Sequence, residues 1–404
     1  MKILITTDAY DTMINGVAVS VRNLQSALKA AGHDARVLTL SQSHHSYVDG
    51  DVYYIKSIPI KIYPDARATI SFNTPLLEDI IDWAPQIIHS QCEFFTFVFA
   101  KKLARHLNIP IVHTYHTLYE YYTHYFCPNK TLSKKIVSTG SRLICNHADA
   151  VIAPTKKTEH ILKNYGVSSP IAVIPTGLSL EMLQKPVDEN FQTELKTSLH
   201  IPENVPVLVT VGRLAREKNI DFLIEQMQTP KVRSRNAHLV IVGDGPDRSR
   251  LEALVSDAGL RENVHFTGMI PSENIYRYYH LGDIFVSASN SETQGLTYIE
   301  AMACGLPVLC MKDECLKTIL NPEVNGCFFE DSESFAKGLM MLTEKSRISF
   351  LKNNALKTAE NFSKKTFAKR AVKLYDNVIL RYHTMPVLYY TLPGSVIHHF
   401  QKRG

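Results

Sequence analysis

The chain has 404 residues, a formal net charge of +5 and a hydrophobic fraction of 45%. Because a single hydrophobic core rarely serves more than about 250–300 residues, this length indicates two domains, and the ordinary composition excludes a disordered or fibrous chain. So small a charge excess gives no reason to expect a nucleic-acid partner, and the uninterrupted apolar runs fall short of the ~20 residues that a membrane-spanning helix needs.

The first part of the chain alternates short apolar runs with helical patterns. Residues 2–5 read as a strand, residues 18–31 as a helix and residues 35–40 as a second strand, which is the start of a parallel sheet. The first run meets Asp8 too early for the apolar core of a signal peptide, so we expect a cytoplasmic protein. Further strands are expected at 86–89, 110–114, 150–153 and 171–174.

A second alternation starts after the polar stretch 183–203. Its expected strands are 206–212, 238–243, 264–266 and 283–286. We therefore expect an α/β protein with two doubly wound domains, residues 1–200 and 201–375. The apolar and aromatic tail, 376–404, should pack back toward the first domain or meet an apolar partner. Ligands of such domains bind beyond the carboxyl ends of the strands, so the site should lie in the cleft between the domains.

Residues 291–300 hold the most informative pattern. Glu292 precedes a helix that starts near Gly295, and Glu300 lies about one turn inside that helix. Free backbone N–H groups at a helix start can face a phosphate, and two carboxylates can accept hydrogen bonds from sugar and ribose hydroxyls. The pattern favours a nucleotide-sugar site. The alternative is a helix start whose acidic residues only complement the helix dipole.

Other candidate residues follow strands at the expected cleft. Arg213 and Lys218 could hold a diphosphate, the alternative being two solvated loop charges. Gly16 could bring its backbone close to a phosphate or sugar, although the full glycine pattern of a dinucleotide site is missing. His116 could contact a sugar hydroxyl as a neutral imidazole, unless it is a structural histidine. The acidic segment 49–51 reads as a hairpin turn rather than a metal pair, so we expect no divalent metal and no obligatory cofactor.

Together these segments resemble the retaining glycosyltransferases of family 4, which have the GT-B fold of two facing Rossmann-like domains. The resemblance spans nearly the whole chain and is carried by residues 15–17, 212–213 with Lys218, 242–246, and 291–303. It implies a UDP-sugar as the donor substrate. In this family the leaving diphosphate is commonly thought to take the acceptor proton on the same face, so no carboxylate nucleophile is expected.

The resemblance also implies a role for each candidate residue. Glu300 would bind the ribose hydroxyls and Glu292 the hydroxyls of the donor sugar. His116 matches the family's cleft histidine near the transferred sugar. The diphosphate would be bound by Arg213, Lys218 and the backbone of Gly16, Gly295, Leu296 and Thr297.

Within the family, residues 113–120 and 291–297 are similar to the bacterial diacylglycerol glucosyltransferases, which make monoglucosyldiacylglycerol from UDP-glucose. This similarity implies UDP-glucose and diacylglycerol, or another lipid acceptor, as partners. Residues 130–146 support a membrane role independently, because apolar side chains there alternate with cations that suit an anionic bilayer. The cations are Lys130, Lys134, Lys135 and Arg142. We expect a peripheral protein on the inner face of the cell membrane, with tyrosines of segment 119–126 at the interface.

Alternatives to each part of this interpretation stay open. Segment 130–146 could be an ordinary helix whose apolar side packs on the sheet. The enzyme could transfer its sugar to a soluble sugar or a growing polysaccharide, or could be a nucleotide-sugar epimerase of similar architecture. The protein could also bind nucleotide sugars without catalysis, although the presence of Glu292, Arg213, Lys218 and His116 weighs against this.

Overall fold

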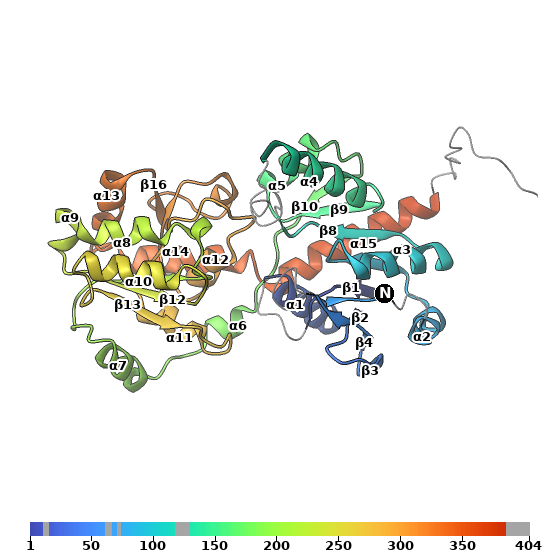
Figure 1. Cartoon of the computed structure of the whole chain (residues 1–404), viewed down its shortest axis with the longest axis horizontal. Helices are drawn as coiled ribbons and strands as arrows, with labels where there is room; N and C mark the ends of the chain where they lie inside the picture. The colour runs from blue at the N-terminus through green and yellow to red at the C-terminus, as the bar shows by residue number, and fades with distance from the viewer. Residues whose placement is uncertain (11–15, 61–66, 71–73, 118–129, 385–404) are drawn as a thin grey trace, which may run out of the picture.

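The computed structural model describes residues 1–10, 16–60, 67–70, 74–117 and 130–384, the side chains of 130–133 excepted. Two α/β halves lie side by side along the long axis of the molecule (Figure 1). The expected fold class is confirmed: each half is a Rossmann-like unit built on a parallel sheet, and together they form a GT-B fold.

The N-terminal half is built on an eight-stranded sheet of order β10-β9-β8-β7-β1-β2-β4-β3. The pairs are parallel apart from β3, which runs antiparallel to β4. The β3–β4 connection is the hairpin turn expected at 49–51. The strands are β1 (Lys2–Thr6), β2 (Asp34–Leu40), β3 (Tyr47–Asp49), β4 (Val52–Ile55), β7 (Ile87–Ser90), β8 (Ile111–Thr114), β9 (Ala150–Ala153) and β10 (Ile171–Val173), and the short pair β5 (Ile58–Pro59) and β6 (Arg67–Ala68) stands apart.

Strands β1, β7, β8 and β9 are almost wholly buried because helices cover both faces of the sheet. Their sequences are therefore continuous apolar runs, which made them visible from sequence. The helices of this half are α1 (Gly16–Ala30), α2 (Leu76–Trp83), α3 (Phe95–Leu107), α4 (Lys130–Cys145) and α5 (Lys156–Asn164).

The C-terminal half has a six-stranded parallel sheet of order β13-β12-β11-β14-β15-β16. The strands are β11 (Val207–Val211), β12 (His238–Val242), β13 (Val264–Gly268), β14 (Ile284–Ser287), β15 (Val308–Met311) and β16 (Gly326–Phe329). The helices are α6 (Leu180–Leu183), α7 (Glu189–Ser198), η2 (Arg216–Lys218), α8 (Ile220–Gln228), α9 (Pro230–Arg233), α10 (Arg248–Asp257), α11 (Ile275–Leu281), α12 (Leu296–Ala303), η3 (Glu314–Leu316), α13 (Ser332–Leu342) and α14 (Ile348–Glu360).

The last described helix, α15 (Lys364–Thr384), returns to the N-terminal half (Figure 1). Its side chains Phe367, Ala371 and Tyr375 pack in one cluster with Ile3 of β1. Residues 364–375, which we expected in the C-terminal domain, thus contribute to the N-terminal core. The part of the expected tail at 385–404 lies outside the described residues.

The chain also crosses from the N-terminal to the C-terminal half earlier than expected: the crossing lies ahead of α6, not near residue 200. Leu180 and Leu183 of α6 pack in the core of the C-terminal half, and Leu195 of α7 packs beside β11 and β12. The polar residues 183–203 looked like a linker because most side chains of α7 are exposed and none is fully buried. Residues from about 178 to 362 therefore pack with the C-terminal half.

The two backbone segments that connect the halves pair with each other. Leu178 N–H donates to Phe362 O at 2.8 Å, and Lys364 N–H donates to Leu178 O at 2.8 Å. A Cβ added to Gly177 would lie 2.6 Å from Phe367 Cβ, so only glycine lets the segments approach this closely. The halves are joined by two backbone segments that lie side by side.

Candidate active site

The start of α12 carries the loop that we expected to bind a phosphate. Gly295 precedes the helix with φ 79°, and a Cβ there would lie 2.8 Å from the ring of Tyr298. This left-handed turn directs the chain into α12, whose first residues are Leu296 and Thr297. Thr297 lines a pocket together with residues of the loop after β11. The free amides at the helix start therefore lie beside this pocket.

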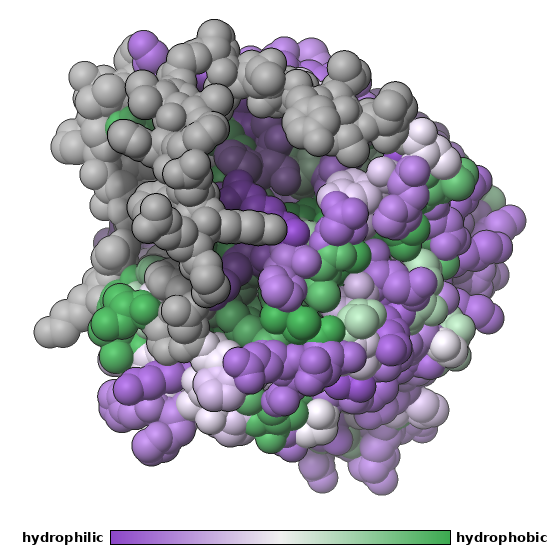
Figure 2. Space-filling model, turned by 90° about the vertical axis from the view of Figure 1, so that its right-hand side faces the viewer, coloured by the Kyte–Doolittle hydropathy of each residue, from purple (hydrophilic) through white to green (hydrophobic). Residues whose placement is uncertain are grey.

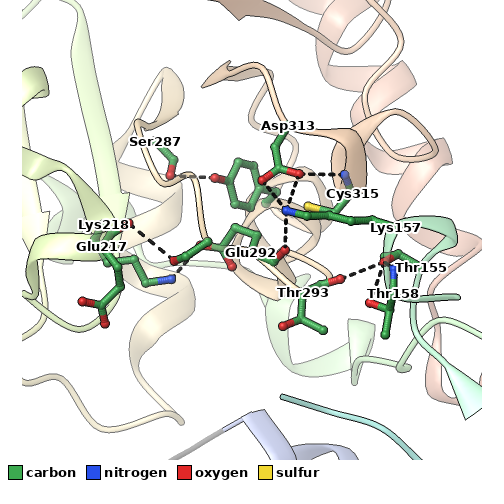
Figure 3. Close-up of polar contacts among 12 residues, drawn as sticks. Thr155, Lys157, Thr158, Glu217, Lys218, Ser287, Glu292, Thr293, Asp313 and Cys315 are labelled. Atoms are coloured by element: carbon green, nitrogen blue, oxygen red, sulfur yellow. Dashed lines mark hydrogen bonds and ion pairs between the residues drawn. The ribbon is translucent and has the colours of Figure 1, made fainter. Parts of the chain in front are cut away.

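Lys218 and Glu292 line the same pocket, and their side chains point toward each other in Figure 3. Lys218 Nζ donates to Glu292 Oε1 at 2.6 Å, and the two side chains are 29% and 13% exposed. Burial raises the pKa of Glu292, but Lys218, the Ser289 hydroxyl and the charge of Lys157 together offset this and hold the pKa below its ordinary value. Glu292 is therefore an ionised hydrogen-bond acceptor, and the ammonium of Lys218 that pairs with it lines the same pocket.

Arg213 lines the pocket beside Gly212 and pairs with Glu217, its Nη2 donating to Oε1 at 2.6 Å. The turn after β12 fixes the backbone here. A Cβ on Gly243 would lie 1.9 Å from Gly212 O, and one on Gly245 would lie 2.3 Å from Leu214 O. The turn at 243–246, which read as an ordinary turn when taken alone, thus supports the loop that carries Arg213.

Glu300 lies one turn inside α12, as expected. Tyr279 of α11 donates from its hydroxyl to Glu300 Oε2 at 2.7 Å. Burial raises the pKa of Glu300, and this hydrogen bond offsets the rise only in part. Tyr279 holds one carboxylate oxygen and fixes the side chain's direction. The tyrosine could not be identified as a site residue from sequence, because α11 reads as an ordinary amphipathic helix.

Gly16, the first residue of α1, faces the start of α12 across the cleft. A Cβ added to Gly16 would lie 3.4 Å from Leu296 Cδ1. The structure therefore brings the glycine of the N-terminal half close to the expected diphosphate loop. Asn15, which belongs to the same expected turn, lies outside the described residues.

His116 follows β8 and donates from Nε2 to Gln91 Oε1 at 2.7 Å. Burial lowers the pKa of His116 to about 4, which makes the imidazole neutral near pH 7. The Gln91 amide lies 3.0 Å from His89, whose Nδ1 lies 2.6 Å from the hydroxyl of Tyr375 on α15. A hydrogen-bonded chain thus runs from α15 to His116. Sequence offered no signal for Tyr375, which is 286 residues from His89.

Contacts between the halves include residues that the sequence analysis did not single out. Lys157, at the start of α5, donates to both carboxylate oxygens of Asp313 at 2.9 Å. Each of these residues follows a strand, β9 or β15, at its carboxyl end, and this position was the signal that could have identified them. Figure 3 shows Lys157 and Asp313 beside the loop that carries Glu292.

Helix α4 holds the cations that we expected at a membrane. Lys134, Lys135 and Arg142 are exposed, whereas the side chain of Lys130 lies outside the described residues. The apolar residues divide: Val137, Ile144 and Cys145 pack on the N-terminal core, while Ile136 and Leu143 are 60% and 54% exposed. The helix therefore packs on the sheet and also presents apolar side chains beside cations to solvent. The tyrosines of segment 119–126 lie outside the described residues.

The described part of the chain contains no cluster of side chains suited to a metal ion. It also contains no helix that is both long and apolar enough to cross a bilayer.

Comparison with known proteins gives matches over both halves. The family model for glycosyltransferase family 4 matches residues 14–182, and that for glycosyl transferases group 1 matches residues 191–367. An alpha-monoglucosyldiacylglycerol synthase of Streptococcus pneumoniae is 31% identical over 84% of this chain and 78% of its own length. The synthase of the same name from Acholeplasma laidlawii is 30% identical over 94% of this chain and 98% of its own length.

Solved structures share the fold. A sucrose-phosphate synthase from Thermosynechococcus elongatus superposes with a TM-score of 0.71 at 23% identity, covering 94% of this chain and 99% of its own. The Anabaena protein HepE, solved in complex with UDP, superposes with a TM-score of 0.70 at 18% identity, covering 93% of this chain and 100% of its own.

Proposed function

Because the chain belongs to the family 4 glycosyltransferases with the GT-B fold, we propose that it transfers glucose from UDP-glucose to the free hydroxyl of diacylglycerol with retention of configuration. The relatives that are 30–31% identical carry the name of this activity, and their matches extend over both halves of the chain. The product would be alpha-monoglucosyldiacylglycerol.

The donor site is the part that the geometry supports best. One observation carries it: the Lys218–Glu292 ion pair lies in a pocket shared with Arg213 and Thr297. Lys218 would bring a positive charge to the diphosphate from the wall of this pocket while it orients Glu292. Arg213 supplies a second cation, and the amides that start α12 supply neutral donors. The leaving group's growing charge would thus be stabilised by groups already in place.

The two carboxylates would bind hydroxyls on either side of the diphosphate. Glu292 is ionised, which suits it to accept hydrogen bonds from the sugar and makes it a poor proton donor. Glu300, held by Tyr279 through Oε2, would offer its other oxygen to the ribose. With neutral His116 near the sugar and the leaving phosphate as proton acceptor, this scheme needs neither a metal ion nor a carboxylate nucleophile.

The lipid acceptor requires contact with a membrane, and α4 offers a surface for it. Exposed Ile136 and Leu143 are accompanied by Lys134, Lys135 and Arg142, a combination that favours anionic bilayers. Figure 2 views the molecule from the side of the N-terminal half and shows hydrophobic patches among hydrophilic side chains on this side. We place the protein on the inner face of the cell membrane as a peripheral enzyme.

Purified protein incubated with UDP-glucose and diacylglycerol in anionic mixed micelles tests the proposal. The expected result is a monoglucosylated lipid detected by mass spectrometry, with an alpha linkage in its proton NMR spectrum. Absence of glycolipid, together with turnover on a soluble sugar without lipid, would replace diacylglycerol by a soluble acceptor. Conversion of UDP-GlcNAc alone into an isomer would instead identify an epimerase.

A further inference from the structure

The loop that carries Glu292 is held from both halves of the molecule. On the C-terminal side, its carboxylate bonds to Lys218. On the N-terminal side, Lys157 Nζ lies 3.4 Å from Glu292 O, and the Thr155 hydroxyl donates to Thr293 O at 3.0 Å. The backbone of the loop is therefore fixed from the start of α5, while the side chain of Glu292 points toward Lys218 (Figure 3) and lines the donor pocket.

The next residue of the loop strengthens this connection. Gln294 is buried and bonds twice to the backbone of Thr176: Thr176 N–H donates to Oε1 at 2.8 Å, and Nε2 donates to Thr176 O at 3.1 Å. Thr176 lies just before the passage between the halves. Buried polar groups need such partners, so the loop keeps this position only while the halves stay together.

The ion pair between Lys157 and Asp313 is a further contact between the halves beside this loop. The two side chains are only 14% and 6% exposed, and Lys157 Nζ reaches both oxygens of Asp313. Asp313 also accepts from Cys315 N–H at 2.8 Å and so caps η3. A cation from the N-terminal half is thus inserted between two backbone segments of the donor domain.

We propose that Lys157 is a positioning residue that couples the docking of the N-terminal half to the orientation of Glu292 against the donor sugar. Lys157 acts through the peptide of Glu292 and through Asp313, not by touching the reacting atoms. When the halves separate, Lys157 leaves Asp313 and the loop loses its backbone contacts, so Glu292 no longer holds the sugar. When they dock, the N-terminal half, which would bind the acceptor, and the Glu292 loop, which would bind the donor sugar, come together. This inference rests on the donor site of the proposed function.

The consequence for binding is specific to the sugar. UDP without a sugar would be held by Arg213, Lys218, Glu300 and the start of α12, which belong to the C-terminal half. Gly16, the diphosphate residue of the N-terminal half, starts α1 and is not part of α5, which carries Lys157. UDP-glucose adds the contact with Glu292. Loss of Lys157 should therefore weaken UDP-glucose and leave UDP nearly unchanged.

Calorimetric titration with UDP and with UDP-glucose tests this in the full-length protein. For Lys157→Met we expect the dissociation constant of UDP to stay within about twofold, and that of UDP-glucose to rise about tenfold, the worth of one hydrogen bond. The rate of glucosyl transfer should fall about 100-fold, because a small misplacement of a binding group costs that much. Lys157→Arg keeps the charge next to Asp313 and should recover most of the loss.

Two further variants make the result decisive. Lys157→Met combined with Asp313→Asn leaves no uncompensated carboxylate and keeps the cap on η3, so it should fold and show the same loss for UDP-glucose. Lys156→Met is the matched control, because Lys156 is 71% exposed and pairs with Glu159 on the same helix. It should behave as wild type.

The inference is overturned if the double variant binds both ligands and turns over like the wild type, or if Lys156→Met loses as much as Lys157→Met. Failure of the proposed function would appear differently. It would show in the wild-type protein as absent glycolipid, whereas the titrations compare variants without any acceptor.

Discussion

Replacing Lys218 by methionine removes the ammonium that lies 2.6 Å from Glu292 Oε1 while keeping most of the side chain's length. Two losses should combine. A charge-assisted hydrogen bond to the diphosphate contributes about 1.5–3 kcal/mol, which corresponds to roughly 10- to 150-fold in kcat/KM. In addition, Glu292, whose side chain is 13% exposed, loses the cation that keeps it ionised.

The second loss gives the variant a distinct pH dependence. In the wild-type protein burial raises the pKa of Glu292, and Lys218, with smaller contributions from Ser289 and Lys157, offsets that rise. Without the charge and hydrogen bond of Lys218, the pKa of Glu292 moves upward. Because the ionised form binds the sugar, activity is lost as pH falls through this pKa. The acid limb of kcat/KM should therefore lie at higher pH in Lys218→Met than in the wild type.

A continuous assay of UDP release over a pH series, with diacylglycerol in anionic micelles, measures both effects. Lys231→Met is the matched control: this lysine is 62% exposed, lies 3.9 Å from Glu333, and its loss should change kcat/KM by less than about twofold. A Lys218→Met enzyme with an unshifted acid limb, or with kcat/KM within about twofold of wild type, would refute the assignment of Lys218 and Glu292 to one site.

Further predictions concern the join between the halves, a buried acid and the membrane surface. Gly177→Ala places a carbon 2.6 Å from an α15 carbon and should lower the free energy of unfolding in urea by at least about 1–3 kcal/mol, whereas Gly140→Ala, with open space around it in α4, should leave it unchanged or higher. Burial raises the pKa of Asp8 to about 6, so the ionised carboxylate destabilises the folded state above that pH. Asp8→Asn should therefore raise Tm above pH 6, by the equivalent of up to about 3 kcal/mol in the free energy of unfolding. An equal gain near pH 4 would contradict the reasoning. Ile136→Ser with Leu143→Ser should reduce the partition of the protein into anionic vesicles on the order of 100-fold in sedimentation, without changing UDP affinity, and unchanged partition would exclude α4 from the membrane surface.

The strands that carry the donor site could be predicted because they are buried on both faces. Residues 206–212 and 283–286 are continuous apolar runs, and they correspond to β11 and β14. Polar residues that follow such runs gather at one edge of a parallel sheet, which is why Lys218 and Glu292 were expected together although 74 residues separate them.

The pairing of Lys157 with Asp313 could not be predicted in the same way. Their positions after β9 and β15 mark each as a candidate site residue, but the two strands belong to separate sheets, and the residues become a buried pair only when these sheets dock. The expected domain limits at residues 200 and 375 were wrong for a related reason. Helix α15 has the composition of any amphipathic helix, and nothing in residues 364–375 says which of two cores its apolar side will join.

The paired passages at Leu178 and Ser363 constrain how the molecule can open. A motion that keeps these hydrogen bonds turns one half against the other about the paired segments, because sliding the segments past each other would break the bonds. We therefore expect the halves to open by a hinge motion at this point. In the proposed transferase, each closure would then return the N-terminal half to the same alignment with the donor pocket.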